Sequence, residues 1–196
     1  MPLAETLGRL FGSLVAELPS TIEIAVEGDI GAYDTRIVGL SVLKGLFGRI
    51  SEEPVTYVNA PQRAREHGVD VREVKSTTSA EYVNLVTVSG GGHSLSGTVA
   101  AHRRQQRIVS IDGHTFDVPP ADHMLMVTND DRPGVIGTVG TLLGSAGVNI
   151  ADMDVGRAET TGTAVMLIAP TTLVDPAVVD ALRAAPGILS VAMLSG

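Results

Sequence analysis

The side chains best suited to ligand chemistry are Asn129, Asp130, Asp131 and Asn149, in the last third of the chain. The first three lie between an apolar, strand-like segment and a run expected to be helical, where N–H groups at the helix start can bind a carboxylate. A carboxylate side chain can accept hydrogen bonds from an ammonium group, while amide groups hold a carboxylate. This mixture fits a zwitterionic amino acid. It fits equally an Asp131 that caps the helix and an Asn149 that marks a turn.

The hydrophobic pattern after residue 120 predicts the elements that position these side chains. Strands are expected over 124–128, 148–155, 163–169 and 188–194, helices over 135–146 and 175–185, and a hairpin turn over 157–162. This βαββαβ order predicts a ferredoxin-like sheet with both helices on one face. Gly137, Gly140 and Gly144 each weaken the first helix by about 1 kcal/mol relative to Ala. Close approach to a sheet or to a neighbouring chain must compensate for them.

The preceding residues predict a separate α+β domain with an antiparallel sheet. Helices are expected over 1–18, 36–49 and 60–67, and strands over 22–26, 55–58, 69–74, 82–88, 95–101, 107–111 and 115–118. Gly90-Gly91-Gly92 is typical of a hairpin tip, because a phosphate cradle would need a helix after it and none is predicted. Pro119-Pro120 marks the boundary. The expected domains are therefore residues 1–120 and 121–196.

Composition excludes several classes of function. The 196 residues are 44% apolar, enough for a packed core, and carry a formal net charge of −8 without a long run of Lys or Arg. This balance argues against a nucleic-acid partner. The absence of cysteine excludes thiol catalysis and Cys-based zinc sites, and it fits a cytoplasmic protein. Apolar stretches are interrupted before the roughly 20 residues of a membrane span, so no membrane anchor is expected.

The common catalytic signatures are missing from the sequence. It contains no G-x-G-x-x-G, Walker, G-x-S-x-G or H-E-x-x-H motif. Its histidines lack the spacing of metal ligands. They are His67, His93, His102, His114 and His123. We therefore expect no catalytic residue, no metal site and no cofactor in this chain.

Two long strings resemble a known enzyme family. NDDRPGVIGTVGTLLGSAGVNIADMDVGR, residues 129–157, resembles the ACT domain of bacterial D-3-phosphoglycerate dehydrogenases, whose hallmarks are D/N-R-P-G-V-I-G and A-G-V-N-I-A. YDTRIVGLSVLKGLFGRISEEPVTYVNAP, residues 33–61, resembles the intervening, allosteric substrate-binding domain of the longer form of that enzyme. Residues 107–127 resemble the junction between the two. The resemblance covers essentially the whole chain in the same order, without the nucleotide-binding and substrate-binding domains.

The resemblance implies a regulatory role in serine biosynthesis. L-serine, the end product, would bind between two ACT domains of a homodimer or homotetramer and inhibit a parent oxidoreductase that uses NAD. Asn129 and Asp131 of one subunit and Asn149 of its partner would hold it, with Asp131 contacting the ammonium group. The full set of expected effector-binding residues is Asn129, Asp131, Arg132, Pro133, Gly134, Asn149 and Ile150.

A second site is implied less strongly. Some relatives bind an anionic effector through a basic cluster near the domain junction. Arg107 and His114 keep a basic character there, but Thr115 and Pro119 do not, so only a weak anion site is expected.

Two other functions fit the same residues. The chain could be a stand-alone ACT-type amino-acid sensor or adaptor that acts on another protein, or the tail of an L-serine dehydratase. In each case the chain itself is expected to be no enzyme.

Overall fold

A computed structural model describes residues 1–100, 104–157 and 163–195. The chain folds as two compact units, Met1–Asp112 and Gly113–Gly196. Within the second unit, strand β6 (His114–Val118) packs against strands β8 (Ile150–Arg157) and β9 (Ala164–Pro170). The boundary expected between residues 120 and 121 stays a prediction.

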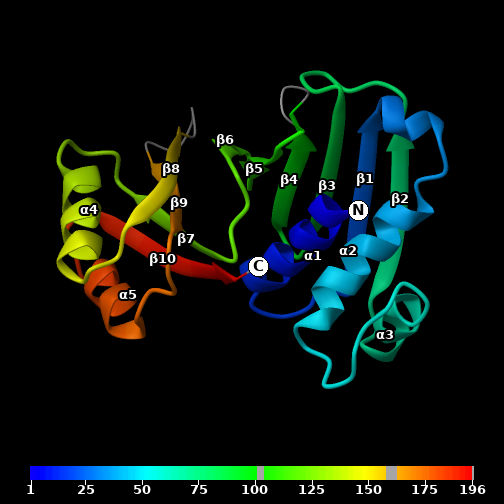
Figure 1. Cartoon of the computed structure of the whole chain (residues 1–196), viewed down its shortest axis with the longest axis horizontal. Helices are drawn as coiled ribbons and strands as arrows, with labels where there is room; N and C mark the ends of the chain where they lie inside the picture. Colours follow the sequence, from blue (N-terminus) through cyan, green and yellow to red (C-terminus); the bar gives the residue numbers. More distant parts are fainter. Residues whose placement is uncertain (101–103, 158–162, 196) are drawn as a thin grey trace. The chain divides into compact units, whose positions relative to one another are not determined.

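The first unit is an α+β domain with a mixed sheet. Its elements are α1 (Pro2–Leu14), β1 (Thr21–Gly28), the 3-10 helix η1 (Asp29–Ala32), α2 (Arg36–Gly48), α3 (Ala60–Glu66), β2 (Asp70–Ser76), β3 (Asn84–Gly90), β4 (His93–Val99) and β5 (Gln106–Ile111). Within Met1–Asp112, the strands of this sheet follow the order β2-β1-β3-β4-β5. β2 runs parallel to β1, whereas an antiparallel sheet was expected. The chain crosses over from β1 to β2 through α2 and α3, as a parallel pair requires (Figure 1).

Helices α1 and α2 pack together at unusually close range. A Cβ on Gly8 would lie 2.0 Å from the carbonyl oxygen of Val42, and one on Gly45 would lie 1.9 Å from that of Glu5. Each helix therefore uses a glycine to admit the backbone of the other. The ammonium group of Lys44 lies 2.9 Å from the Glu5 carboxylate beside this contact.

Two elements of the first unit depart from the prediction and one is confirmed. The strand predicted over 55–58 is wrong, because the Asn59 side-chain oxygen accepts a hydrogen bond from the Thr56 N–H at 2.7 Å and folds the segment into a turn. Helix α1 ends at Leu14 rather than at residue 18, since Val15 adopts an extended backbone. The hairpin predicted at the glycine run is confirmed, with Gly91 and Gly92 at positive φ between β3 and β4.

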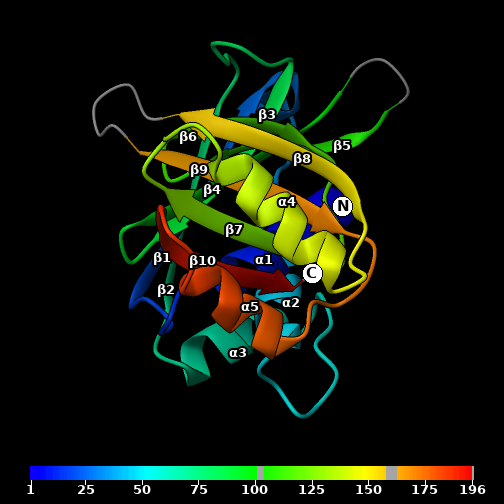
Figure 2. The same ribbon diagram turned by 90° about the vertical axis from the view of Figure 1, so that its left-hand side faces the viewer.

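The second unit has the predicted βαββαβ order after β6. Its elements are β7 (His123–Asn129), α4 (Val135–Ser145), β8 (Ile150–Arg157), β9 (Ala164–Pro170), α5 (Pro176–Arg183) and β10 (Ile188–Ser195). The antiparallel sheet has the order β10-β7-β9-β8, and both helices lie on one face of it, as expected (Figure 2). The turn predicted over 157–162 falls largely on residues 158–162, outside the described ranges.

Helix α4 has one face packed into the core of the second unit and another face that is open. Val139 and Leu143 are fully buried against the sheet. Nothing lies within 4 Å of a Cβ placed on Gly137, Gly140 or Gly144. The glycines therefore make no close approach to the unit's own sheet, and the neighbouring chain that was the alternative explanation stays a prediction.

Candidate functional site

The loop after β7 is shaped by the side chain of Asn129, which is only 2% exposed. Its amide nitrogen donates to the Ala164 carbonyl oxygen on β9, and its side-chain oxygen accepts from the Asp131 N–H, both at 3.0 Å. This hydrogen bond forms an Asx turn, and Asp131 adopts a left-handed backbone with φ of 49°. Asn129 thus positions the loop, and its direct contact with an effector stays a prediction.

An ion pair fixes the next part of the loop. The Arg132 guanidinium donates from Nε to the Asp130 carboxylate at 2.6 Å. This hydrogen bond and the positive charge of Arg132 hold the pKa of Asp130 below its usual value. Asp131, which is exposed, lies between the two paired residues in the sequence. The loop therefore combines a neutralised pair with a further carboxylate.

Helix α4 begins beside this loop without a side-chain cap. Its N-cap is Gly134, at φ of 94°, and among the described residues no side-chain cap hydrogen bond forms there. An open pocket of about 250 Å³ adjoins the helix start, lined by Arg132, Pro133, Gly134, Val135, Thr138, Pro186 and Gly187. N–H groups and the positive end of the helix dipole favour an anion such as a carboxylate there.

The other two predicted residues lie at the far end of α4. Asn149, which is exposed, directly precedes β8, and Ile150 begins that strand and packs against the core. The helix has 11 residues. At about 1.5 Å per residue, it separates the loop at Asp131 from Asn149 by roughly 16 Å. One copy of the chain therefore does not bring Asp131 and Asn149 around one amino acid.

The residues of the expected anion site belong to different units. Arg107 lies on β5, where its guanidinium donates to the Gln105 side-chain oxygen at 3.2 Å. His114 begins β6, and the part of the structure that is described contains no hydrogen-bond partner for its buried Nε2. The weak anion site stays a prediction.

Comparison with protein families decides the family. Residues 1–112 match the D-3-phosphoglycerate dehydrogenase intervening domain, and residues 123–187 match the ACT domain. The chain belongs to the D-3-phosphoglycerate dehydrogenase intervening-domain family. The resemblance found in the sequence is thereby confirmed.

Curated relatives place these two domains within longer proteins. The chain is 37% identical over 173 residues to a D-3-phosphoglycerate dehydrogenase of Mycobacterium tuberculosis, with 85% of this chain and 33% of that protein covered. It is 36% identical to one from Synechocystis, with coverage of 86% and 31%. It is 31% identical to one from Bacillus subtilis, with coverage of 98% and 37%. The chain spans about a third of the length of these relatives.

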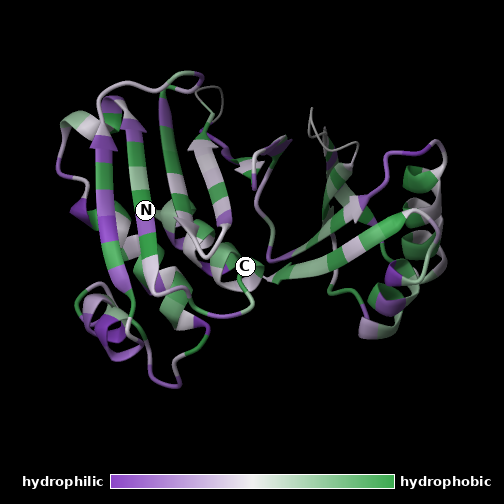
Figure 3. Cartoon of the chain, turned by 180° about the vertical axis from the view of Figure 1, so that it is seen from behind, coloured by the Kyte–Doolittle hydropathy of each residue, from purple (hydrophilic) through white to green (hydrophobic). Residues whose placement is uncertain are grey.

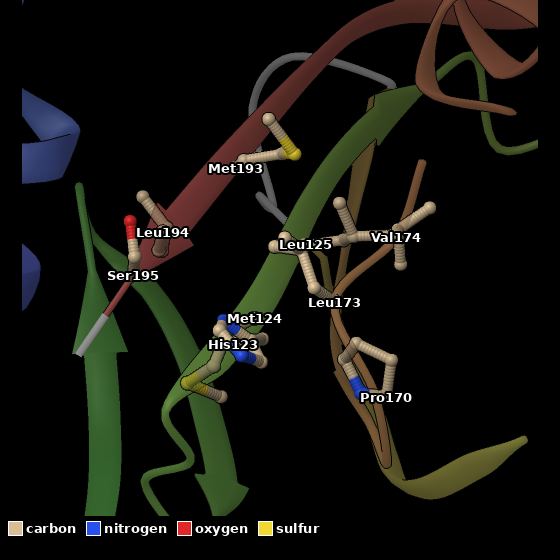
Figure 4. A pocket seen from close by; sticks show the side chains of 9 residues that line it. All are labelled: His123, Met124, Leu125, Pro170, Leu173, Val174, Met193, Leu194 and Ser195. Carbon is tan, nitrogen blue, oxygen red and sulfur yellow. The ribbon is translucent and has the colours of Figure 1, made fainter. Parts of the chain in front are cut away.

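A small apolar pocket that the sequence did not indicate lies at the end of the ACT sheet away from Asn129, and Figure 4 shows the side chains that line it. It has a volume of about 40 Å³ and is lined by His123, Met124, Leu125, Pro170, Leu173, Val174, Met193, Leu194 and Ser195. Its walls come from β7, β10, the end of β9 and the segment after it. These are distant in sequence, so no local motif could have indicated the pocket. None of the predicted effector residues lines it.

In residues 1–100, 104–157 and 163–195, no group of His, Asp or Glu side chains is placed to hold a metal ion. None of the helices in these ranges is long and apolar enough to cross a membrane.

Proposed function

We propose that this chain is the regulatory region of a D-3-phosphoglycerate dehydrogenase and that its ACT domain binds L-serine between two copies. In this proposal, NAD binding and oxidation of 3-phosphoglycerate occur outside residues 1–196. Serine favours one arrangement of the interface, which lowers the activity of the attached catalytic domains in serine biosynthesis.

The observation that carries the proposal is the uncapped start of α4 beside Asp131. Backbone N–H groups at Gly134 and beyond suit the serine carboxylate, and the Asp131 carboxylate suits its ammonium group. Asn149 lies about 16 Å away along α4, so a partner's α4 must run antiparallel to supply Asn149. The glycine face of α4 leaves room for this close approach.

Calorimetric titration of the chain with L-serine tests the proposal. We expect saturable binding that D-serine does not reproduce and that Asp131→Ala and Asn149→Ala each abolish. Asp122→Ala, which removes an exposed carboxylate just before β7, is the matched control and should bind normally. Absence of heat at millimolar L-serine, from a folded dimeric sample, contradicts the proposal.

Mixing the two inactive variants tests whether the site is shared. If Asp131 and Asn149 come from different subunits, a heterodimer of Asp131→Ala and Asn149→Ala has one site with both residues intact. Random exchange makes about half of the dimers mixed, so roughly a quarter of the sites should recover. No recovery after verified exchange means that each subunit supplies both residues to its own site.

A further inference from the structure

Strand β2 leaves one edge of the first sheet without a partner. Among the described residues, β2 pairs only with β1. The Asp70 N–H donates to the Ser20 carbonyl oxygen at 2.8 Å, so alternate residues from Asp70 onward direct their backbone groups toward β1. Val71, Glu73 and Lys75 therefore direct their N–H and C=O groups outward. Such an edge is a template for another strand.

The side chains of β2 are also exposed. Residues 70 and 72–75 are all exposed, so side chains on both faces of the strand reach solvent. The apolar side chain of Val74 is among them, and Val74 retains 47% of its accessible surface. Figure 3 shows the outermost strand as largely hydrophilic, interrupted by apolar positions, beside the more regularly alternating β1. An exposed valine at the centre of a charged edge strand suits a partner that covers it.

Charge decides which antiparallel register a second β2 could adopt. Outward residues must face outward residues, so the two-fold axis must pass through a residue position. Axes at Arg72, Glu73 or Lys75 would place that residue opposite its own copy, which puts like charges together. An axis at Val74 places Val74 opposite Val74 and Glu73 opposite Lys75 on both sides.

An axis at Val71 also avoids like charges, but it is less favourable. It would pair Asp70 with Arg72, which already lie 3.4 Å apart within one strand. It would also centre on a valine that is only partly exposed and leave Val74 uncovered. The axis at Val74 is therefore the register that the charges and the exposed surface favour.

We propose that β2 pairs with β2 of a second copy of this chain, antiparallel and with the two-fold axis at Val74. Glu73 and Lys75 of opposite copies exchange both backbone hydrogen bonds and form cross-strand ion pairs. The Val74 side chains meet on the face away from α2, since Glu73 on the opposite face contacts the position of Gly39. This surface is separate from the proposed serine site, so either proposal can fail alone.

Cysteine cross-linking tests the register, because the chain has no cysteine of its own. Val74 faces its own copy in a non-hydrogen-bonded pair, whose Cα atoms lie about 4.5 Å apart, within the range of a disulfide. Val74→Cys should therefore form disulfide dimers in a glutathione buffer. Arg72→Cys is the control on the same face, but its two copies lie four positions apart in register, or about 14 Å. Equal cross-linking of the two variants, or none with Val74→Cys, overturns the proposal.

Charge reversal in the Val74→Cys background then identifies the partner. Glu73→Lys or Lys75→Glu alone creates two like-charge contacts and should slow cross-linking by about ten-fold. The double reversal restores opposite charges and should restore the rate. Circular dichroism verifies that each variant is folded. Unchanged rates in the single reversals would show that β2 does not pair with itself in this register.

Discussion

The two domains use glycine in their helices in opposite ways. In the intervening domain, Gly8 and Gly45 each touch a backbone carbonyl of the neighbouring helix. In the ACT domain, Gly137 and Gly140 face open space. Gly8 and Gly45 are explained within one copy, because close helix packing compensates for the low helix propensity of glycine. Gly137 and Gly140 lack such compensation within one copy, so they point to an interaction outside the domain.

The largest effect should come from filling the contact between α1 and α2. Gly45→Ala would place a Cβ 1.9 Å from the Glu5 carbonyl oxygen, and relief of this clash requires the helices to separate. We expect a loss of about 3 kcal/mol in the free energy of unfolding, measured by urea denaturation. Gly48→Ala is the matched control, because nothing lies within 4 Å of its Cβ at the end of the same helix. Equal stability of the two variants would mean that Gly45 is not needed for close helix packing, and the difference from the open glycines of α4 would disappear.

A smaller effect should distinguish the starts of the two ACT helices. The Asp175 side chain accepts a hydrogen bond from the Ala177 N–H at 2.8 Å and caps α5, whereas α4 has no side-chain cap. Asp175→Ala should therefore lower the unfolding free energy by about 1 kcal/mol. Asp180→Ala, on the exposed side of α5, serves as the control in thermal denaturation. A similar loss in the control would show that charge rather than capping is responsible.

Gly140→Ala tests directly whether the open glycine face of α4 is used in association. Because the position is open, alanine should raise the unfolding free energy of the dilute protein by up to about 1 kcal/mol through helix propensity. The same methyl group should weaken association if two α4 helices meet there. Denaturation at low concentration and sedimentation at high concentration measure the two effects. Destabilisation of the dilute protein would mean that the glycine face is already packed.

The smallest effect concerns two ion pairs near the starts of α2 and α4. A side-chain hydrogen bond from Arg36 lowers the pKa of Asp34 to about 2, and one from Arg132 lowers the pKa of Asp130. Since the folded state holds each pKa below its unfolded value, the pairs stabilise the fold above that value and lose this contribution as pH falls through the folded pKa. Exposure keeps the contribution small. Carboxyl NMR titration should find both pKa values lowered, and Arg36→Gln should restore that of Asp34 alone.

Elements defined by local pattern were predictable, while pairings set by distant residues were not. The apolar spacing of Ile22, Ile24 and Val26 was enough to predict β1. The parallel direction of β2 depends on a crossover through two helices, which alternation of side chains does not encode. Likewise, the sequence placed Asn129 in a loop but could not show that its amide binds the Ala164 carbonyl, 35 positions away.

The candidate site followed the same rule. Its loop and the start of α4 were predicted from Asp130, Arg132 and Gly134, which are close together in the sequence. The ion pair and the left-handed backbone at Gly134 required the structure, because they depend on loop geometry. Arg107 and His114 belong to separate units, and proximity in the sequence could not indicate this.

The length of α4 affects how the proposed serine response would depend on the cellular concentration of the protein. With Asp131 and Asn149 at opposite ends of an 11-residue helix, the proposed serine site requires two chains. Its formation would therefore depend on protein concentration as well as on serine. Cells with few copies would respond only at higher serine levels, whereas abundant protein would respond earlier. Feedback of this kind would measure the amount of enzyme together with the amount of product.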